Sequence, residues 1–299
     1  MQTLHGKNLL KEKPVVVGIG ELLWDLLPSG KKAGGAPINF VYHATQLGAE
    51  GYAISSVGED LLGNEIIEEL NKNNIRYLIE RVPYPTGTVS VELDDKGIPV
   101  YQITKAVAWD HIKPTANAID LAEQADAICF GTLAQRSKES RETIKSILSF
   151  VSDSAYKFFD INLRQNYFSK EIVEESLYLA NIVKCNNEEL DVLCDFFGIS
   201  PAGDKAVAWL LEKYNLKMFV LTAGASHSTI YTKDEVSTIK TPKVDIKDTV
   251  GAGDSFSGAL IVSLLKGKSL KEAHQFAVET AAYVCSKSGA WPAYGKDTE

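Results

Sequence analysis

A run of small residues ending in an acid, Gly251 to Asp254, lies just before a long apolar stretch. The stretch from Phe256 to Leu265 is apolar almost all round, which predicts a buried helix that ends at Lys266-Gly267. Small residues at a helix start let the backbone approach a ligand closely. The unpaired N–H groups there and the positive end of the helix dipole attract phosphate or a developing oxyanion. The run therefore predicts an anion-binding loop.

Two roles are open for Asp254 at this loop. An aspartate at a helix start most often caps the helix. The alternative is a general base that removes a proton from a hydroxyl while neighbouring amides hold the transferred group. The loop residues alone favour the cap, and the wider pattern described below favours the base.

Further polar residues interrupt apolar segments nearer the N-terminus. Asp25 lies among leucines and a tryptophan, where a carboxylate is usually either a turn residue or a buried hydrogen-bond acceptor, because an unpaired buried charge is costly. Sugar hydroxyls would satisfy it. Gly34-Gly35 precede Pro37 at a predicted helix start, which is either a plain loop-to-helix junction or a place of close ligand approach. Leu23 occupies the third glycine position of the dinucleotide-binding pattern that Gly18 and Gly20 begin, which disfavours a Rossmann dehydrogenase.

The elements that must position these residues follow an α/β order. A strand is predicted at 15–20, a helix at 40–48, a strand at 52–57, a helix at 59–70 and a β-hairpin at 86–104 with its turn at Asp94 to Gly97. From residue 114 onward strands alternate with helices: strands at 127–131, 156–161, 182–185 and 217–222, and helices at 140–151, 171–180, 187–197 and 204–214. A last helix is expected from a capping box at Ser269 to about Gly289.

This order predicts right-handed crossovers and a mostly parallel sheet with helices on both faces. Ligands of such sheets bind at the carboxyl ends of the strands, where every motif named here falls.

Composition narrows the class of protein. A chain of 299 residues with 45% hydrophobic content can bury a large core as one domain. Its net charge of −8 argues against nucleic acid or an anionic membrane as a partner. The polar N-terminus does not have the pattern of a signal peptide, and no apolar run approaches membrane-spanning length. The four cysteines lack metal-site spacing and indicate buried thiols in a reducing compartment. We expect a cytoplasmic protein with no membrane partner.

Several enzyme classes are excluded or disfavoured by their motifs. No G-x-x-x-x-G-K-[ST] pattern occurs, which excludes a P-loop kinase. No G-x-S-x-G occurs, which disfavours an α/β-hydrolase, and no cluster has zinc spacing.

Two motifs carry a resemblance to a known family. DTVGAGDSFSGAL, residues 248–260, closely resembles the C-terminal signature of the PfkB-type, ribokinase-like carbohydrate kinases. GGAPINFVYHATQLGA, residues 34–49, resembles the N-terminal signature in the form typical of fructokinase-like members. The resemblance covers essentially the whole chain. It implies a ribokinase-like three-layer α/β/α sandwich with a mostly parallel central sheet, in a single domain over 1–299. It also implies a small β-sheet lid, with strands from about 26–35 and 86–104, and a homodimer formed through that lid.

The resemblance also implies roles for individual residues. The anion hole for the γ-phosphoryl group would be formed by Gly251, Ala252 and Gly253, and Asp254 would deprotonate the acceptor hydroxyl. The substrate contacts would be Asp25, Gly34, Gly35, Asn39 and Arg164. For Arg164, at the end of a predicted strand, pairing with a surface acid is the alternative. His43 is expected to be packed or solvated rather than catalytic.

Nucleotide and metal sites are implied in the same way. Asn186 and Glu189 fit an N-x-x-E motif that organises Mg²⁺ and phosphate through water, although a capping sequence would explain them equally. Thr222 and Gly224 match a loop beside the nucleotide, and their alternative is an ordinary strand-to-turn junction. Asp248 and Thr249 match a segment that helps bind a monovalent cation, K⁺, in many members.

The expected function is an ATP-dependent sugar kinase that uses Mg²⁺ and phosphorylates a primary hydroxyl, with D-fructose as the expected acceptor and fructose 6-phosphate as the product. A 2-keto-3-deoxygluconate kinase stays open, because the Asn-Leu-Arg segment that ends at Arg164 resembles sugar-acid kinases as well as fructokinases. Gln135 stands where some relatives carry an acid that touches the sugar, so the acceptor is not fixed by resemblance. A catalytically silent sugar or nucleotide sensor is the non-enzyme alternative, and the intact loop argues against it.

Overall fold

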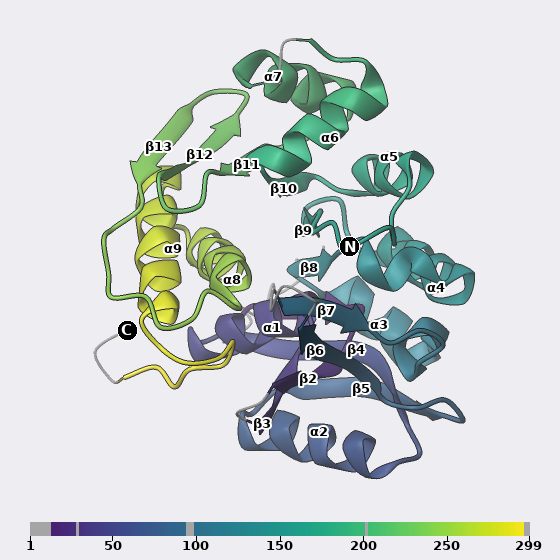
Figure 1. The fold of residues 1–299 in the computed structure, drawn as a ribbon. Helices are drawn as coiled ribbons and strands as arrows, with labels where there is room; N and C mark the ends of the chain where they lie inside the picture. The colour runs from purple at the N-terminus through teal and green to yellow at the C-terminus, as the bar shows by residue number, and fades with distance from the viewer. Residues whose placement is uncertain (1–12, 28–29, 94–98, 201–202, 296–299) are drawn as a thin grey trace, which may run out of the picture.

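A large twisted sheet forms the centre of the molecule (Figure 1). The computed structural model describes residues 13–27, 30–93, 99–200 and 203–295. Over these ranges the central sheet has nine strands in the order β13-β12-β11-β10-β9-β8-β1-β4-β5. Their bounds are β1 Val15–Ile19, β4 Glu50–Gly58, β5 Arg76–Val82, β8 Ala127–Phe130, β9 Tyr156–Asp160, β10 Ile182–Asn186, β11 Met218–Thr222, β12 His227–Thr232 and β13 Val236–Lys240.

The seven strands from β11 to β5 are parallel, and β12 and β13 form an antiparallel hairpin at one edge. The mostly parallel sheet predicted from the strand–helix alternation is therefore confirmed.

Helices cover both faces of this sheet, as the two buried apolar clusters show. In β8, Ile128 and Phe130 join one cluster while Ala127 and Cys129 join the other. One cluster is shared with α1 Ala36–Gln46, α2 Leu61–Lys72, α8 Ala252–Leu265 and α9 Leu270–Cys285. The other is shared with α3 Ala116–Gln124, α4 Lys138–Phe150, α5 Lys170–Leu179, α6 Asn187–Phe197 and α7 Asp204–Lys213. The three-layer sandwich expected from the sequence is thus confirmed.

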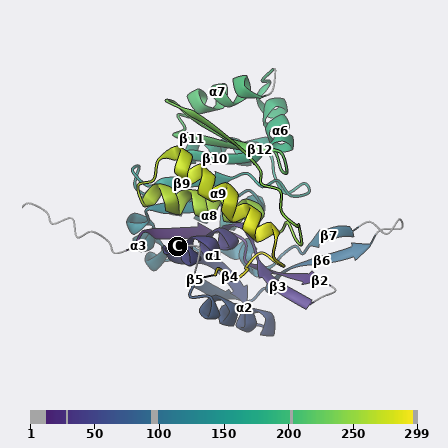
Figure 2. The ribbon, with the colours of Figure 1, turned by 90° about the vertical axis from the view of Figure 1, so that its left-hand side faces the viewer.

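A second sheet projects from one side of the sandwich, as Figure 2 shows. Its order is β3-β2-β6-β7, and it consists of β2 Leu23–Leu27, β3 Gly30–Gly34, β6 Gly87–Leu93 and β7 Pro99–Ile103. It begins at Leu23, three residues before the expected start of the lid at about residue 26. Side chains alternate along β2, so that Leu23, Asp25 and Leu27 face the cavity described below. The hairpin turn predicted at Asp94 to Gly97 lies outside the described residues, as does most of the N-terminal segment.

Helix α8 packs between α1, α9 and the central sheet, which explains why it is apolar all round. Gly258 allows the close approach of α1, because a Cβ at this position would lie 3.0 Å from the backbone oxygen of Phe40. The helix begins at Ala252, one turn earlier than the predicted apolar stretch. This shift places Asp254 inside the first turn.

Some elements differ from the sequence predictions. Helix α9 ends at Cys285 rather than near Gly289, where φ is 84° and the chain turns. The sequence patterns did not predict three strands and one α-helix of the structure: strands β5, β12 and β13 and helix α3. The residues of β13 are all at least partly exposed, and only the last residue of β5 is buried, so neither strand carries a strong apolar pattern. Within the described ranges, no helix combines the length and apolar character needed to cross a membrane.

Candidate active site

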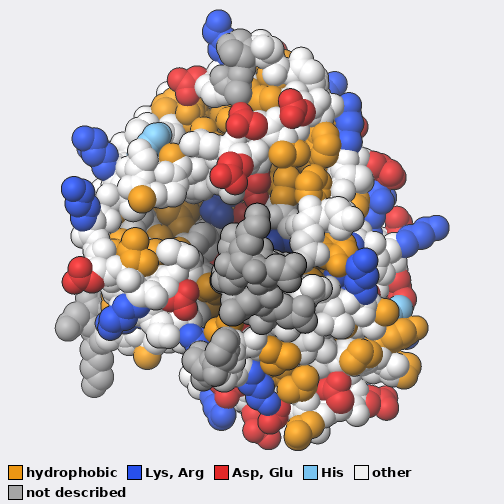
Figure 3. Space-filling model, viewed as in Figure 1, with side chains coloured by type: hydrophobic (Ala, Val, Ile, Leu, Met, Phe, Trp, Pro, Cys, Tyr) orange, Lys and Arg blue, Asp and Glu red, His pale blue; other side chains and the backbone are white. Residues whose placement is uncertain are grey.

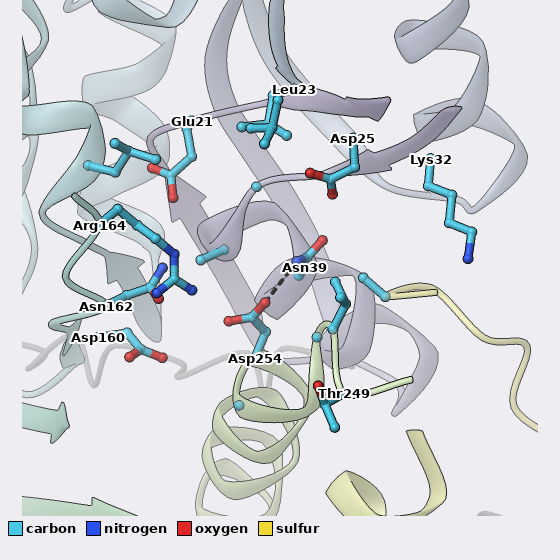
Figure 4. Close-up of a pocket in the computed structure, with 18 of the residues that line it drawn as sticks. Glu21, Leu23, Asp25, Lys32, Asn39, Asp160, Asn162, Arg164, Thr249 and Asp254 are labelled. Carbon is cyan, nitrogen blue, oxygen red and sulfur yellow. Dashed lines mark hydrogen bonds between the residues drawn. The ribbon is translucent and has the colours of Figure 1, made fainter. Parts of the chain in front are cut away.

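A cavity of about 1020 Å³ opens at the carboxyl ends of the parallel strands. It lies between the small sheet and the start of α8, and Figure 3 shows the hollow near the middle of this face, with acidic and basic side chains in it. Asp254 is central in the close-up view of Figure 4, with Glu21, Asp160 and Arg164 on one side and Asp25 and Lys32 on the other. The motifs near the two ends of the chain therefore meet in one place.

The loop from Gly251 to Gly253, here called the glycine loop, borders this cavity, and both of its glycines line it. Gly251 is the N-cap residue of α8 and has a φ of 78°, which only glycine adopts without strain. A Cβ on Gly251 would lie 2.9 Å from the Cα of Ala290, so the loop also needs glycine for space. No side chain caps this helix start. The Ala252 amide donates to the Thr249 carbonyl at 3.3 Å, and the amides that follow it in the first turn can bind an anion.

Asp254 is not the cap of α8, so the first of its two roles is excluded. Its Oδ2 accepts a hydrogen bond of 2.8 Å from Nδ2 of Asn39 on α1, drawn as a dashed line in Figure 4. Burial raises the pKa of Asp254 to about 6, and the charge of Asp160 adds to this shift. Asn39, Lys184 and Arg164 act in the opposite direction by stabilising the carboxylate. A carboxyl with this pKa suits proton abstraction near neutral pH.

A buried ion pair beneath the loop was not predicted. Lys184 Nζ on β10 lies 2.7 Å from Asp160 Oδ2 at the end of β9, and both side chains are 9% exposed. Ser257 on α8 also donates to this Asp160 oxygen. A Cβ on Gly253 would lie 3.2 Å from Lys184 Nζ, so the ammonium group lies directly beside the loop. A lysine inside the apolar strand Ile182–Asn186 was the available sequence signal, because a buried cation needs a partner.

Glu21 is a second functional candidate that sequence reasoning missed. It follows β1, is 2% exposed and lines the cavity. Burial raises its pKa to about 7, and its Oε2 has no hydrogen-bond partner among the described residues. Its position directly after the strand-ending Gly20 was the only signal in the sequence. A buried carboxyl with a free oxygen at a cavity wall is suited to bind a ligand hydroxyl.

Asp25 lines the cavity from β2. Burial raises the pKa of Asp25 to about 6, and the charge of Asp248 adds to this shift. Gly34 lies behind it: a Cβ there would lie 2.7 Å from Asp25 Oδ2, so the glycine makes room for this carboxyl. Gly35 has a φ of 115° and a Cβ on it would collide with the backbone oxygen of Glu21. The two glycines therefore allow β3 and α1 to approach the acids of the site.

Most of the residues expected at the site line the cavity. These are Asp25, Gly35, Asn39, Arg164, Asn186, Glu189, Thr222, Asp248, Thr249, Gly251, Gly253 and Asp254. Three expected residues are not part of the lining: Gly34, Ala252 and Gly224. Gly224 lies in an exposed turn with a φ of 52°. Both polar groups of the Asn39 side chain bond to protein atoms, and its substrate contact stays a prediction.

Asn186 and Glu189 form a capping box at the start of α6. Asn186 Oδ1 accepts from the Glu189 amide at 2.8 Å, and Glu189 Oε2 accepts from the Asn186 amide at 2.9 Å. Glu189 Oε1 accepts from the Leu163 amide at 2.9 Å. The carboxylate is therefore held by two backbone amides, and Glu189 is one of the residues that line the cavity. In the described part of the chain no cluster of three His, Cys, Asp or Glu residues forms a metal site.

Asp248 is also well partnered. Its Oδ1 accepts from the Val250 amide at 3.1 Å and its Oδ2 from the Gly289 amide at 2.9 Å. Lys32 Nζ lies 3.8 Å from the same Oδ2 and donates to Ser288 at 3.0 Å. Asp248 thus ties the loop before α8 to the segment after α9.

The chain is similar to known carbohydrate kinases. The profile of the pfkB family carbohydrate kinases matches residues 29–294. An uncharacterised sugar kinase of Pyrococcus horikoshii is 31% identical over 95% of this chain and 94% of its own length. Its crystal structure superposes with a TM-score of 0.79, covering 93% of both chains.

Two further relatives are fructokinases. The enzyme of Rhizobium leguminosarum bv. trifolii is 28% identical over 84% of this chain and 79% of its own length. The ATP-bound fructokinase of Xylella fastidiosa shares the fold with a TM-score of 0.83 at 20% identity, covering 93% of this chain and 94% of its own. The extent of the profile match and the identity to the Pyrococcus horikoshii protein assign the chain to a family: it belongs to the pfkB family of carbohydrate kinases and is a fructokinase-like sugar phosphotransferase.

Proposed function

We propose that this protein transfers the γ-phosphoryl group of ATP to a primary hydroxyl of D-fructose and gives fructose 6-phosphate. The observation that carries the proposal is the placement of Asp254 in the first turn of α8, facing the cavity beside uncapped backbone amides. A base and an anion site are thereby held within one turn of helix. Positioning and charge stabilisation are most of what phosphoryl transfer requires.

The reaction uses the two parts of this loop together. The acceptor oxygen attacks the γ-phosphorus as its proton passes to a carboxylate oxygen of Asp254. The bond from the γ-phosphorus to the bridging oxygen breaks, ADP leaves, and the proton later passes from Asp254 to water. The amides near Gly251, Ala252 and Gly253 donate to the phosphoryl oxygens as charge develops on them, and the Ala252 amide gives up its 3.3 Å bond to the Thr249 carbonyl to do so.

A magnesium ion bound with ATP would neutralise phosphate charge. The rigid carboxylate of Glu189 and the neighbouring Asn186 suit water molecules of such an ion, because oxygen donors and retained water are what Mg²⁺ prefers. Thr222 lies opposite Asn186 on the neighbouring strand and lines the cavity, and we assign it to the nucleotide. Support for ATP comes from the Pyrococcus horikoshii relative, which has also been crystallised in complex with ATP. A K⁺ ion near Asp248 and Thr249 belongs to the proposal as an accessory, although Asp248 already has two amide donors.

The neutral acceptor is favoured by the charges of the cavity. Among the described residues, six carboxyls and three cationic side chains line it, and of the carboxyls Glu21, Asp25 and Asp254 can bind sugar hydroxyls. The fructokinase relatives support the same choice. Arg164 also lines the cavity, and its exposed guanidinium group favours 2-keto-3-deoxygluconate as the second candidate because it would pair with the carboxylate of a sugar acid.

The test is Mg-ATP-dependent ADP release over fructose, ribose, glucose, 2-keto-3-deoxygluconate and adenosine, with Asp254→Asn beside the wild type. We expect turnover on fructose, and a kcat that is lower in Asp254→Asn by a factor on the order of 100 or more. Asp120→Asn, the same chemical change at an exposed residue of α3, serves as the control and should retain full turnover. Turnover on the sugar acid instead would select the second candidate. No turnover on any acceptor, with intact sugar binding, would favour the sensor.

A further inference from the structure

The segment after α9 returns to the active site and contacts the residue that holds Asp254. Trp291 Nε1 lies 2.7 Å from Asn39 Oδ1. Asn39 Nδ2 in turn lies 2.8 Å from Asp254 Oδ2. A chain of two hydrogen bonds therefore connects Trp291 to the proposed base through an asparagine that is 5% exposed.

The chemistry of the three side chains fixes the direction of both hydrogen bonds. An indole N–H can only donate, so the atom of Asn39 that faces it must be the carbonyl oxygen. The amide nitrogen of Asn39 then faces Asp254, where an ionised carboxylate needs a donor. If the Asn39 amide were flipped, its NH₂ group would face the indole N–H of Trp291, and its oxygen would face the carboxylate of Asp254. Trp291 therefore selects the amide orientation that stabilises the carboxylate.

The segment that carries Trp291 is held firmly against α1, the helix that carries Asn39. The indole stacks on the ring of Tyr42, with centroids 5.2 Å apart and an interplanar angle of 3°. The hydroxyl of Tyr42 donates to the Pro292 carbonyl at 2.7 Å. His43 Nδ1 and the Tyr294 hydroxyl are also 2.7 Å apart. These contacts leave the indole little freedom to move away from Asn39.

We propose that Trp291 is a positioning residue for the base: it holds Asn39 as a donor to Asp254, and so keeps Asp254 ionised and one of its oxygens aimed at the acceptor hydroxyl. This role rests on the proposed function, in which Asp254 is the base. The free energy of the two hydrogen bonds is coupled, because loss of the first frees the asparagine amide to rotate and lose the second.

The first test does not require turnover. The chain has four tryptophans, and their indole N–H groups give separate NMR signals in protein labelled with ¹⁵N-tryptophan. The signal that disappears in Trp291→Phe should shift with pH around a midpoint near 6, the pKa of Asp254. The shift should disappear in Asp254→Asn. A Trp291 signal that is independent of pH, or that titrates equally in Asp254→Asn, would overturn the proposal even if the protein phosphorylates no tested sugar.

The second test uses the pH dependence of kcat. Trp291→Phe keeps a ring against Tyr42 but removes the N–H donor. We expect the acid limb of the kcat profile of this variant to move to higher pH by up to about one unit. The reason is that the ionised carboxylate of Asp254 loses part of its hydrogen bond from Asn39. We also expect kcat to fall by a larger factor than KM for the sugar rises. An acid limb identical to that of the wild type would contradict the proposal.

Tyr42→Phe is the matched control for this second test. It removes the hydroxyl bond to Pro292 and perturbs the same segment, but it leaves the indole donor in place. Its acid limb should coincide with that of the wild type. An equal shift in both variants would mean that general loosening of the segment, rather than the indole hydrogen bond, causes the effect, and the proposal would then fail.

Discussion

At the scale of single residues, the proposed chemistry depends on the protonation state of Asp254. Burial and the charge of Asp160 raise its pKa to about 6. A base acts only in its ionised form, so kcat should rise as the pH passes from 5 to 7 and then level off. A kcat profile measured between pH 5 and 8.5 checks this. The residual activity of Asp254→Asn should lack the limb near pH 6, and its persistence there would assign the limb to another group.

Glu21 gives a prediction about stability rather than rate. Burial raises its pKa from an ordinary value of 4.5 to about 7, so the folded protein holds this proton more tightly than the unfolded chain. The unfolding free energy contributed by Glu21 is therefore fully present below pH 4.5 and is lost as the pH rises to about 7. The loss amounts to about 3 kcal/mol.

The amide of Glu21→Gln cannot ionise, so this variant should not show the loss of stability at high pH. We expect the change in unfolding free energy caused by the substitution to be more favourable at pH 8 than at pH 5, by up to about 3 kcal/mol. Urea unfolding of variant and wild type at both pH values measures this difference. Glu123→Gln, at an exposed position of α3, should show no such change between the two pH values. Equal effects of Glu21→Gln at pH 5 and pH 8 would show that Glu21 is not held protonated.

At the scale of elements, helix α8 has a left-handed glycine at each end. Gly251 has a φ of 78° and Gly267 a φ of 77°. A Cβ on Gly267 would meet nothing within 4 Å, whereas one on Gly251 would lie 2.9 Å from Ala290. Gly267→Ala should therefore cost only the backbone strain, about 1 kcal/mol, and retain turnover.

Gly251→Ala carries the same backbone strain and adds a steric overlap, for a total cost of about 2 to 4 kcal/mol. It also displaces the amides of the loop, so we expect at least a tenfold loss of kcat. Thermal unfolding and steady-state kinetics of the two variants measure both effects. A comparable loss of kcat in Gly267→Ala would imply that strain at either end of α8 lowers turnover. The loop at Gly251 would then have no specific role in catalysis.

The elements that could be predicted from the sequence are those with strong local patterns. Helix α8 and the glycine loop before it were predictable because an apolar run and small residues lie in sequence order. Strand β13 was not, because none of its residues is fully buried and the apolar pattern is weak. Glu21, Lys184 and Trp291 were missed for a different reason. Their roles depend on contacts with residues of other segments, and local spacing does not encode such contacts.

At the scale of the whole molecule, the site joins segments from both ends of the chain under the small sheet. That sheet has two different faces. Leu23, Asp25 and Leu27 of β2 face the cavity. On the other face Trp24 is covered by α2, since its Nε1 donates to the Leu62 carbonyl at 3.0 Å, while Leu26 is 37% exposed. A homodimer formed through the lid, as the sequence predicts, would bury this leucine.

We therefore expect the 32.7 kDa chain to sediment at twice its mass, and Leu26→Asp to shift it toward the monomer, because a buried unpaired carboxylate opposes association. Phe150→Asp is the control: Phe150 is 41% exposed at the end of α4, away from the small sheet, and its substitution should leave the dimer intact. Sedimentation velocity over a range of concentrations distinguishes the three proteins. A wild type that is monomeric at every concentration, or a dimer broken equally by both substitutions, would exclude the lid as the contact. If Leu26→Asp is monomeric and still phosphorylates the sugar with unchanged KM, the cavity is complete within one chain and the dimer contact serves stability rather than catalysis.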